Sequence, residues 1–283
     1  MLIAQITDLH IRPGEDGRRN DARLLQVLDR VADAGPDLVI ATGDLTDEGD
    51  EPSYRRLRQL LGALPMDVHL ALGNHDCRAA MLRVFPETPV EDGLVQYVID
   101  SGARRIIVLD TLAEGRHGGH FSPAQGAWLA ARLAEAPDRP TLIALHHPPV
   151  DSGIGWMDAE SEEGWAAPLE AAVAGHMQVA GYITGHIHRP SVAQFGGRPL
   201  VIGSSTAPQV ALDLALMPIA RGDGRPLIVE EAPGFVLHRW TAQGLVSHFA
   251  DARDNAVLAR HADMLSIDEA DPMAWHMTHE TER

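Results

Sequence analysis

Residues 68–76, VHLALGNHD, indicate the fold class of this chain. This stretch opens with a short apolar run, residues 68–72, and ends in Gly73-Asn74-His75-Asp76. A short apolar run bounded by a turn residue such as glycine is typical of a strand buried in a sheet. In sheets whose strands alternate with helices, ligands bind beyond the carboxyl ends of the strands. The polar residues after this run are therefore expected where such a sheet binds its ligand.

Other apolar runs along the chain end in the same manner. Polar residues follow directly after 2–7 at Asp8, after 38–42 at Gly43-Asp44, after 141–145 at His146-His147, and after 179–184 at Gly185-His186. Residues 94–100 and 105–110 are further predicted strands. Helical spacing or a helix-starting proline marks segments between the runs, at 24–31, 52–64, 123–133 and 165–174. This alternation predicts an α/β fold.

The pattern changes after residue 196. Residues 199–203, 234–240 and 245–249 are predicted strands, and proline, glycine and alanine are frequent between 204 and 232. The predicted organisation is a core over 1–203, a cap or dimerisation insertion over 204–232, returning core strands over 233–250, and a polar C-terminal tail over 251–283. The apolar stretch 210–219 would be poorly buried in a monomer, so we expect a homodimer or a larger homo-oligomer.

The composition limits the partners. The chain has 283 residues, with 23 Lys and Arg against 40 Asp and Glu, and its formal net charge is −17. Such a charge repels phosphates, so neither a nucleic-acid polymer nor an anionic membrane is an expected partner. A small anionic substrate is compatible with this charge, because a bound metal ion reverses its sign locally. The single cysteine, Cys77, and the lack of a basic leader or a long apolar run favour a cytoplasmic protein.

The side chains at the strand ends form a set of metal ligands. In chain order they are Asp8, His10, Asp44, Asn74, His75, His146, His147, His186 and His188. Carboxylate, amide and imidazole groups together suit Mn, Fe, Zn or Co, and the set contains none of the thiolates of structural zinc sites. One ion does not need so many ligands. Two divalent or mixed-valence ions that share a bridging carboxylate would use them.

Five motifs, taken in order, carry a resemblance to a known family. The motifs are TDLH at 7–10, GDLTD at 43–47, GNHD at 73–76, LHHPP at 145–149 and GHIH at 185–188. Over residues 2–190 the chain resembles the calcineurin-like metallophosphoesterases. Within them it is most similar to the class III cyclic-nucleotide phosphodiesterases and the bacterial glycerophosphodiesterases. The resemblance implies a four-layer αββα sandwich with a small C-terminal β cap, and a metal-dependent phosphodiesterase, that is, a phosphoric diester hydrolase.

The resemblance also implies roles for individual residues. One metal ion would be bound by Asp8, His10, Asp44 and His188, and the other by Asp44, Asn74, His146 and His186. Asp44 would bridge the two ions. His75 and Asp76 are the expected catalytic pair, in which Asp76 orients His75. His147 is expected directly behind the ligands, and the choice of His146 over His147 as the ligand stays open.

Further residues are expected to contact the substrate. Besides Asn74 and His75 these are His117, in a glycine-rich loop at the rim of the same cleft, and Arg12, close to His10. Asp47, at the end of GDLTD, is interpreted as a loop or capping residue.

The expected chemistry follows from the bond that is broken. A phosphodiester resists hydrolysis because its anionic oxygens repel a nucleophile and its alkoxide leaves poorly. Two metal ions about 3.5–4 Å apart generate hydroxide near neutral pH and bind the oxygens of an in-line displacement. We therefore expect a hydroxide that bridges the ions to attack phosphorus, with His75 donating a proton to the leaving group.

The expected substrates are small phosphodiesters, either 3′,5′-cyclic nucleotides such as cAMP or glycerophosphodiesters. The glycerophosphodiesterase branch has a cap histidine near the position where this chain has Pro208, which favours broad or cyclic-nucleotide activity. A phosphomonoesterase or a nuclease of the same superfamily is the alternative, and the charge of −17 counts against a nuclease. A non-catalytic scaffold with this fold would lack ligands, and the motifs here contain them all.

Overall fold

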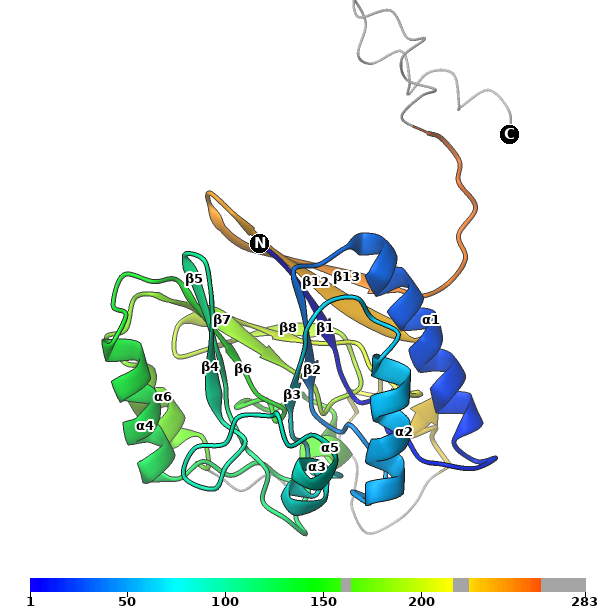
Figure 1. The fold of residues 1–283 in the computed structure, drawn as a ribbon, viewed down its shortest axis with the longest axis horizontal. Coiled ribbons are helices and arrows are strands. Elements are labelled where there is room, and N and C mark those ends of the chain that lie inside the picture. The colour runs from blue at the N-terminus through cyan, green and yellow to red at the C-terminus, as the bar shows by residue number, and fades with distance from the viewer. Residues whose placement is uncertain (159–163, 216–223, 261–283) are drawn as a thin grey trace, which may run out of the picture. The chain divides into compact units, whose positions relative to one another are not determined.

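The computed structural model describes residues 1–158, 164–215 and 224–260 of the chain. The chain divides into two compact units, residues 1–252 and residues 253–283. In the second unit the described residues, 253–260, form no helix or strand. All the helices and strands below belong to the first unit (Figure 1).

The first sheet has the strand order β13-β12-β1-β2-β3. Its strands are β1 Leu2–Ile6, β2 Leu38–Thr42, β3 Val68–Ala71, β12 Gly234–Thr241 and β13 Gly244–Asp251. β1, β2 and β3 are parallel, whereas β12 pairs antiparallel with β1, and β13 with β12. β1 therefore lies in the middle of a mixed sheet, although it precedes the other strands in the chain.

Two amphipathic helices pack on this sheet. α1 spans Arg18–Ala34 and ends at Gly35, whose φ of 58° lies in the left-handed region that glycine adopts without strain. α2 spans Glu51–Leu61, and the carboxylate of Asp50 caps its first turn. In the described part of the chain, neither these helices nor any other is long and apolar enough for a membrane span.

The second sheet has the strand order β4-β5-β6-β7-β9-β8. Its strands are β4 Tyr97–Ser101, β5 Arg104–Val108, β6 Thr141–Ala144, β7 Val179–Thr184, β8 Ser191–Phe195 and β9 Arg198–Ile202. β5, β6, β7 and β9 are parallel, and the edge strands β4 and β8 are antiparallel to their neighbours. The helices α4, Pro123–Ala134, and α6, Ala167–Val173, pack against each other and against this sheet.

The side chains of the second sheet alternate between two apolar cores. Leu142 and Ala144 lie in the core that includes the first sheet, whereas Ile143 and Leu145 lie in the core that includes α4 and α6. The alternation arises because successive strand residues point to opposite faces. Figure 1 shows α1 and α2 outside one sheet, α4 and α6 outside the other, and the two sheets between them. The predicted α/β fold with four layers, αββα, is confirmed.

Five short elements lie outside the predictions from sequence. They are α3 Arg78–Val84, α5 Gly155–Asp158, β8, and the antiparallel pair β10 Gln209–Val210 and β11 Ile228–Val229. β8 exposes most of its side chains and so has no apolar run. β10 and β11 lie within the predicted cap, of which residues 216–223 are outside the described residues, as are residues 261–283 of the predicted tail. The dimerisation role of the cap stays a prediction.

Candidate metal centre

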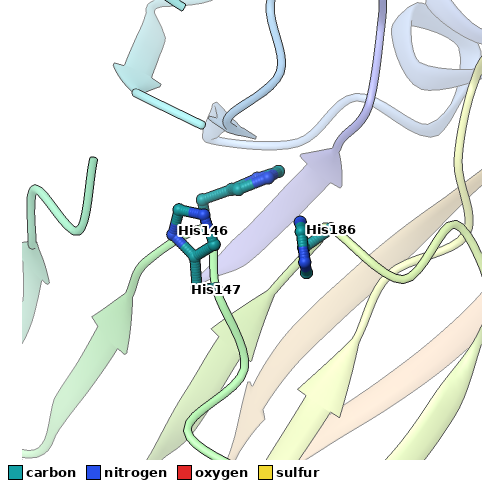
Figure 2. Close-up of side chains that lie close together, drawn as sticks. All are labelled: His146, His147 and His186. Carbon is teal, nitrogen blue, oxygen red and sulfur yellow. The ribbon is translucent and has the colours of Figure 1, made fainter. Parts of the chain in front are cut away.

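The polar residues at the strand ends meet between the two sheets. They follow β1, β2 and β3 in the first sheet and β6 and β7 in the second: Asp8, His10, Asp44, residues 73–76, His146, His147, His186 and His188. Figure 2 shows His146, His147 and His186 close together at the ends of their strands. Both sheets therefore present their carboxyl ends to one site, as is typical of ligand sites in α/β folds.

Several of these residues have a left-handed backbone. The φ angles are 53° at Asp8, 46° at His10, 47° at Asp44, 70° at His186 and 53° at His188. Among the other described non-glycine residues, only Asp92 has a positive φ. This conformation costs about 1–2 kcal/mol for a residue with a Cβ. Such strain persists where the surrounding structure enforces it, and it is concentrated at functional sites.

The first ligand group consists of Asp8, His10, Asp44 and His188. One ligand atom of each lies within 4.8 Å of the others. The Nε2 atoms of His10 and His188 are 3.0 Å apart. His188 Nδ1 donates a hydrogen bond of 2.9 Å to the Pro208 carbonyl, so the Nε2 lone pair of the neutral ring faces the site. Asp8 Oδ2 is buried and lacks a hydrogen-bond partner among the described residues. A cation bound here would satisfy these atoms, so the group fits a metal ion.

The second expected ligand group is Asp44, Asn74, His146 and His186. Asn74 Oδ1 lies 2.9 Å from His186 Nδ1 and 3.3 Å from His146 Nε2. His146 Nδ1 donates a hydrogen bond of 2.8 Å to the Thr42 carbonyl, so its Nε2 likewise presents a lone pair in the neutral ring. Asp44 Oδ2 lies 3.4 Å from His146 Nε2 and 3.6 Å from His10 Nε2. This one carboxylate oxygen is therefore common to both groups.

His147 lies directly behind the second group. Its Nδ1 is 2.8 Å from Thr111 Oγ1, and its buried Nε2 lacks a hydrogen-bond partner among the described residues. Nitrogen atoms of His146, His147 and His186 lie within 4.8 Å of one another, so distance alone would also accept His147 as a ligand. Asn74 contacts both His146 and His186, which favours Asn74 over His147 as the ligand beside them. The choice of His146 over His147 stays a prediction.

The buried charges of the site shift one another's pKa values. Burial raises the pKa of Asp8 to about 6. Burial also raises the pKa of Asp44, but the adjacent His146 outweighs burial and holds that pKa well below its usual range. Burial lowers the pKa of His146, but the carboxylates of Asp44 and Asp8 outweigh it and raise that pKa to about 9. His146 therefore keeps a proton near neutral pH, and a divalent cation would take the place of that proton.

His75 lies beside both ligand groups. Its amide donates a hydrogen bond of 2.9 Å to Asp44 Oδ1, and its ring centroid is 4.6 Å from that of His10. Its Nδ1 donates a hydrogen bond of 2.9 Å to the carbonyl oxygen of Asp47. Nε2 is then the ring atom that can exchange a proton with a ligand. The catalytic role of His75 stays a prediction that this geometry allows.

The structure corrects the expectation that Asp76 orients His75. The contacts that the structure describes for the buried Asp76 carboxylate do not include the His75 ring. Instead the carboxylate accepts hydrogen bonds from the amides of Leu45, Thr46 and Gly73 and from the hydroxyls of Thr46 and Tyr54. Asn74 and His75 form a turn, in which the amide of Asp76 donates to the Gly73 carbonyl over 3.1 Å, so adjacency in sequence does not bring the Asp76 carboxylate to the His75 ring. Asp76 holds the GDLTD and GNHD loops together.

Asp47 has a role that the sequence analysis missed. Its Oδ1 lies 3.3 Å from His10 Nδ1, and its backbone carbonyl holds His75. A carboxylate behind a ligand histidine fixes the tautomer and the orientation of the ring. Arg12, a predicted substrate contact, has its NH1 atom 3.4 Å from Asp47 Oδ2. The available signal was the position of Asp47 three residues after Asp44, within the same motif.

His117 reaches the site from the loop after β5. Its Nδ1 lies 3.5 Å from Asn74 Nδ2, and its ring centroid is 6.2 Å from that of His75. His117 is exposed, so a ligand could contact it. His117 and Arg12 therefore border the site from separate loops, and their contact with substrate stays a prediction.

Two glycines allow the loops to approach closely. A Cβ at Gly73 would lie 2.3 Å from Asp44 Oδ1 and 2.7 Å from His146 Nε2. A Cβ at Gly43 would lie 2.5 Å from His146 Nδ1. A side chain at either position would displace a ligand, so glycine is required before Asp44 and before Asn74.

Comparisons with known proteins identify the family. The sequence profile of the calcineurin-like phosphoesterase family matches residues 1–190. The chain is 32% identical over 257 residues to a probable glycerophosphodiester phosphodiesterase of Arcobacter nitrofigilis, covering 88% of this chain and 92% of the relative. It is 37% identical over 231 residues to a probable cyclic nucleotide phosphodiesterase of Rhodopseudomonas palustris, covering 77% and 82%.

Solved structures share the fold. A dimetal phosphatase from Danio rerio superimposes with a TM-score of 0.68, covering 90% of this chain and 97% of that chain. The identity is 15%, so this likeness concerns the fold alone.

Proposed function

The chain belongs to the calcineurin-like phosphoesterase family, and from this premise we propose that it is a binuclear metal-dependent phosphodiesterase acting on small phosphodiesters. The observation that carries the proposal is the position of Asp44. Its Oδ2 atom is shared by two groups of ligand atoms, which come from both sheets. A shared carboxylate is what a pair of closely spaced ions requires.

The two groups would hold one ion each, with Asp44 between them. Carboxylate, imidazole and amide oxygen suit Mn, Fe, Zn or Co. When bound, such ions lower the pKa of water and neutralise the charge of a phosphate, which are the two requirements for attack on a diester.

The remaining chemistry belongs to side chains beside the ions. The Asp47 carbonyl fixes His75 Nδ1, so Nε2 is the atom that donates a proton to the departing alkoxide. Asn74 Nδ2 points toward His117, and these two groups would bind the phosphoryl oxygens on one side. Arg12 would do so from the side of Asp47.

Cyclic nucleotides are the first substrate candidate and glycerophosphodiesters the second. Relatives of both kinds match most of the chain, at 37% and 32% identity respectively. Pro208 favours the first. The glycerophosphodiesterase branch is expected to have a histidine there, whereas the side chain of Pro208 has no donor for a glycerol hydroxyl and its carbonyl already holds His188.

The chain is further proposed to form a homodimer or a larger homo-oligomer in the cytoplasm. Leu212, Leu214, Leu227 and Ile228 are exposed around β10 and β11. Such a group of exposed apolar residues marks an interaction surface. A monomeric mass by light scattering at micromolar concentration would contradict this assembly.

The test is hydrolysis by metal-stripped protein before and after addition of Mn²⁺. Bis(p-nitrophenyl) phosphate is assayed beside p-nitrophenyl phosphate, and cAMP beside glycerophosphoethanolamine. We expect Mn²⁺-dependent cleavage that favours the diester of the first pair, and cAMP in the second.

Each other outcome identifies an alternative. Preference for p-nitrophenyl phosphate would replace the proposal by a phosphomonoesterase. Binding of two Mn²⁺ ions without turnover of any substrate would favour a non-catalytic role.

A further inference from the structure

The loop 204–208 lies behind the first ligand group. The amide of Ala207 and the hydroxyls of Ser205 and Thr206 donate to the Asp8 carbonyl over 3.0, 3.1 and 3.3 Å. Asp8 is held in a left-handed conformation that costs energy, so its backbone needs such support.

The same loop orients a second member of this group. The Pro208 carbonyl accepts the hydrogen bond of 2.9 Å from His188 Nδ1. The loop thus supports Asp8 and His188 from behind. The hydrogen bonds that the structure describes for the loop do not include any to Asn74, His146 or His186, which are ligands of the second group.

Arg23 of α1 holds the loop from its other side. Its Nε donates to the Thr206 carbonyl over 2.7 Å and its NH2 to the Ala207 carbonyl over 3.0 Å. The side chain is only 9% exposed, although it belongs to a surface helix. The rigid fork of a guanidinium matches two adjacent carbonyls, which a lysine ammonium cannot do equally well. Loss of Arg23 would leave both buried carbonyls without this partner.

We propose that Arg23 is a positioning residue for the metal ion of the first ligand group. By fixing the carbonyls of Thr206 and Ala207, it sets the backbone that holds Asp8 and the Pro208 carbonyl that orients His188. The inference rests on the proposed function, because it requires that the first group binds an ion. Arg23 itself contacts neither ion nor substrate. The loop that it holds donates to the Asp8 carbonyl and accepts from His188, so its effect is expected at the first ion.

The test is calorimetric titration of Mn²⁺ into the metal-stripped chain. In Arg23→Gln we expect the affinity of the first group to fall ~10–100-fold, the usual effect of removing support behind a ligand, with the other binding step unchanged. Asp8→Asn identifies the step that belongs to the first group. Arg23→Lys keeps one donor atom, so its affinity for the first ion should fall less than that of Arg23→Gln.

Arg19→Gln is the matched control. Arg19 lies one turn away on the same helix and pairs with Glu230 at 2.7 Å, as Arg23 does at 3.9 Å. The hydrogen bonds that the structure describes for Arg19 lead to Glu230 and not to the loop. Both binding steps should therefore keep the wild-type affinity. Weakening of the first step in Arg19→Gln as large as in Arg23→Gln would overturn the proposal.

Other outcomes separate this inference from the proposed function. If Arg23→Gln weakens both binding steps equally, or weakens neither step, the inference is overturned and the proposed function stands. If Arg23→Gln does not fold, the same criterion applies to Arg23→Lys. Two wild-type binding steps without hydrolysis of any diester contradict the function and leave the inference standing. A wild-type chain that binds no Mn²⁺ overturns both.

Discussion

The two ligand groups share Asp44 but are supported by different parts of the chain. His146 of the second group donates to the carbonyl of Thr42, the last residue of β2, which lies between two parallel neighbours in a mixed sheet. His188 of the first group donates to the carbonyl of Pro208, in a loop. A strand is fixed by its own hydrogen-bond ladder, whereas a loop carbonyl needs other partners to hold it. The second group is thus built by the core, and the first depends on a loop that must itself be held.

The largest effect is expected at the residue that the two groups share. Asp44→Asn removes the charge that both ions need, so both should be lost and activity should fall by more than ~10⁴-fold, beyond the loss of one proton-transfer group. Metal content by mass spectrometry and diester hydrolysis measure this. Asp92→Asn, at an exposed left-handed aspartate outside the site, is the control. Retention of one tightly bound ion would show that Asp44 is not shared.

His75 lies beside both groups without belonging to either. His75→Gln should keep both ions and lower kcat for cAMP by ~10²–10⁴-fold, because the alkoxide leaves without its proton. The kcat for bis(p-nitrophenyl) phosphate should fall far less, since p-nitrophenolate leaves without being protonated. His248→Gln, at an exposed position of β13, should match the wild type. An equal loss on both substrates would contradict proton donation by His75.

The support of the second group extends into the sheet as far as His238. Thr42 Oγ1 accepts a hydrogen bond of 2.9 Å from Gln5 Nε2, and Gln5 Oε1 lies 3.0 Å from His238 Nε2. Burial lowers the pKa of His238 to about 3, below its ordinary value of 6.5. The unfolded chain therefore binds the proton more readily than the folded chain, and stability is lost as the pH falls below 6.5 toward 3.

Below about pH 6, we expect protonation of His238 in the unfolded chain to lower the free energy of unfolding by up to about 1.4 kcal/mol per pH unit. His238→Gln keeps both hydrogen-bonding directions without a titratable group, so its stability should fall less steeply. Urea unfolding of the metal-free protein at several values between pH 7 and pH 5 measures the two slopes. His120→Gln, at an exposed position between β5 and α4, is the control, with the wild-type slope. Parallel curves for wild type and His238→Gln would contradict this role.

The smallest effect should come from one contact of the loop. Ser205→Ala removes one of three donors to the Asp8 carbonyl and should weaken only the first ion, by less than ~10-fold, since one hydrogen bond contributes about 1 kcal/mol. Mn²⁺ titration measures the change, with Ser204→Ala in the same loop as the control. A loss larger than that of Arg23→Gln would reverse the order of importance within the loop.

The fold and the clustering of the motif residues could be predicted because both leave local signals. Each apolar run ends at a polar motif, so the position of a residue such as Asp44 follows from the strand before it. α3 left no such signal: it has seven residues, and its first turn has no side-chain cap at Cys77. The role of Asp76 could not be predicted because most of its partners lie far away in the sequence, at Leu45 and Thr46 of GDLTD and at Tyr54 of α2.

The supporting residues could not be predicted, for a physical reason. Arg23 lies in an amphipathic helix, where an arginine side chain is ordinarily exposed to solvent. Its partners are backbone carbonyls more than 180 residues later in the chain, at Thr206 and Ala207. Every residue has a carbonyl, so such a partner has no signature in the sequence. The same holds for the Asp47 carbonyl that holds His75.

The position of β1 between β2 and β12 has a consequence for biosynthesis. The ribosome delivers β1 long before β12, and at roughly 5–20 residues per second the interval is tens of seconds. Throughout that time one edge of β1 lacks its native neighbour and could pair with another nascent chain. Because Asp8 follows β1 directly and its carbonyl is held by residues 205–207, the metal site likewise cannot reach its native support until this late part of the chain has been synthesised. Chaperones that shield strand edges should therefore raise the yield of active protein more than its total yield.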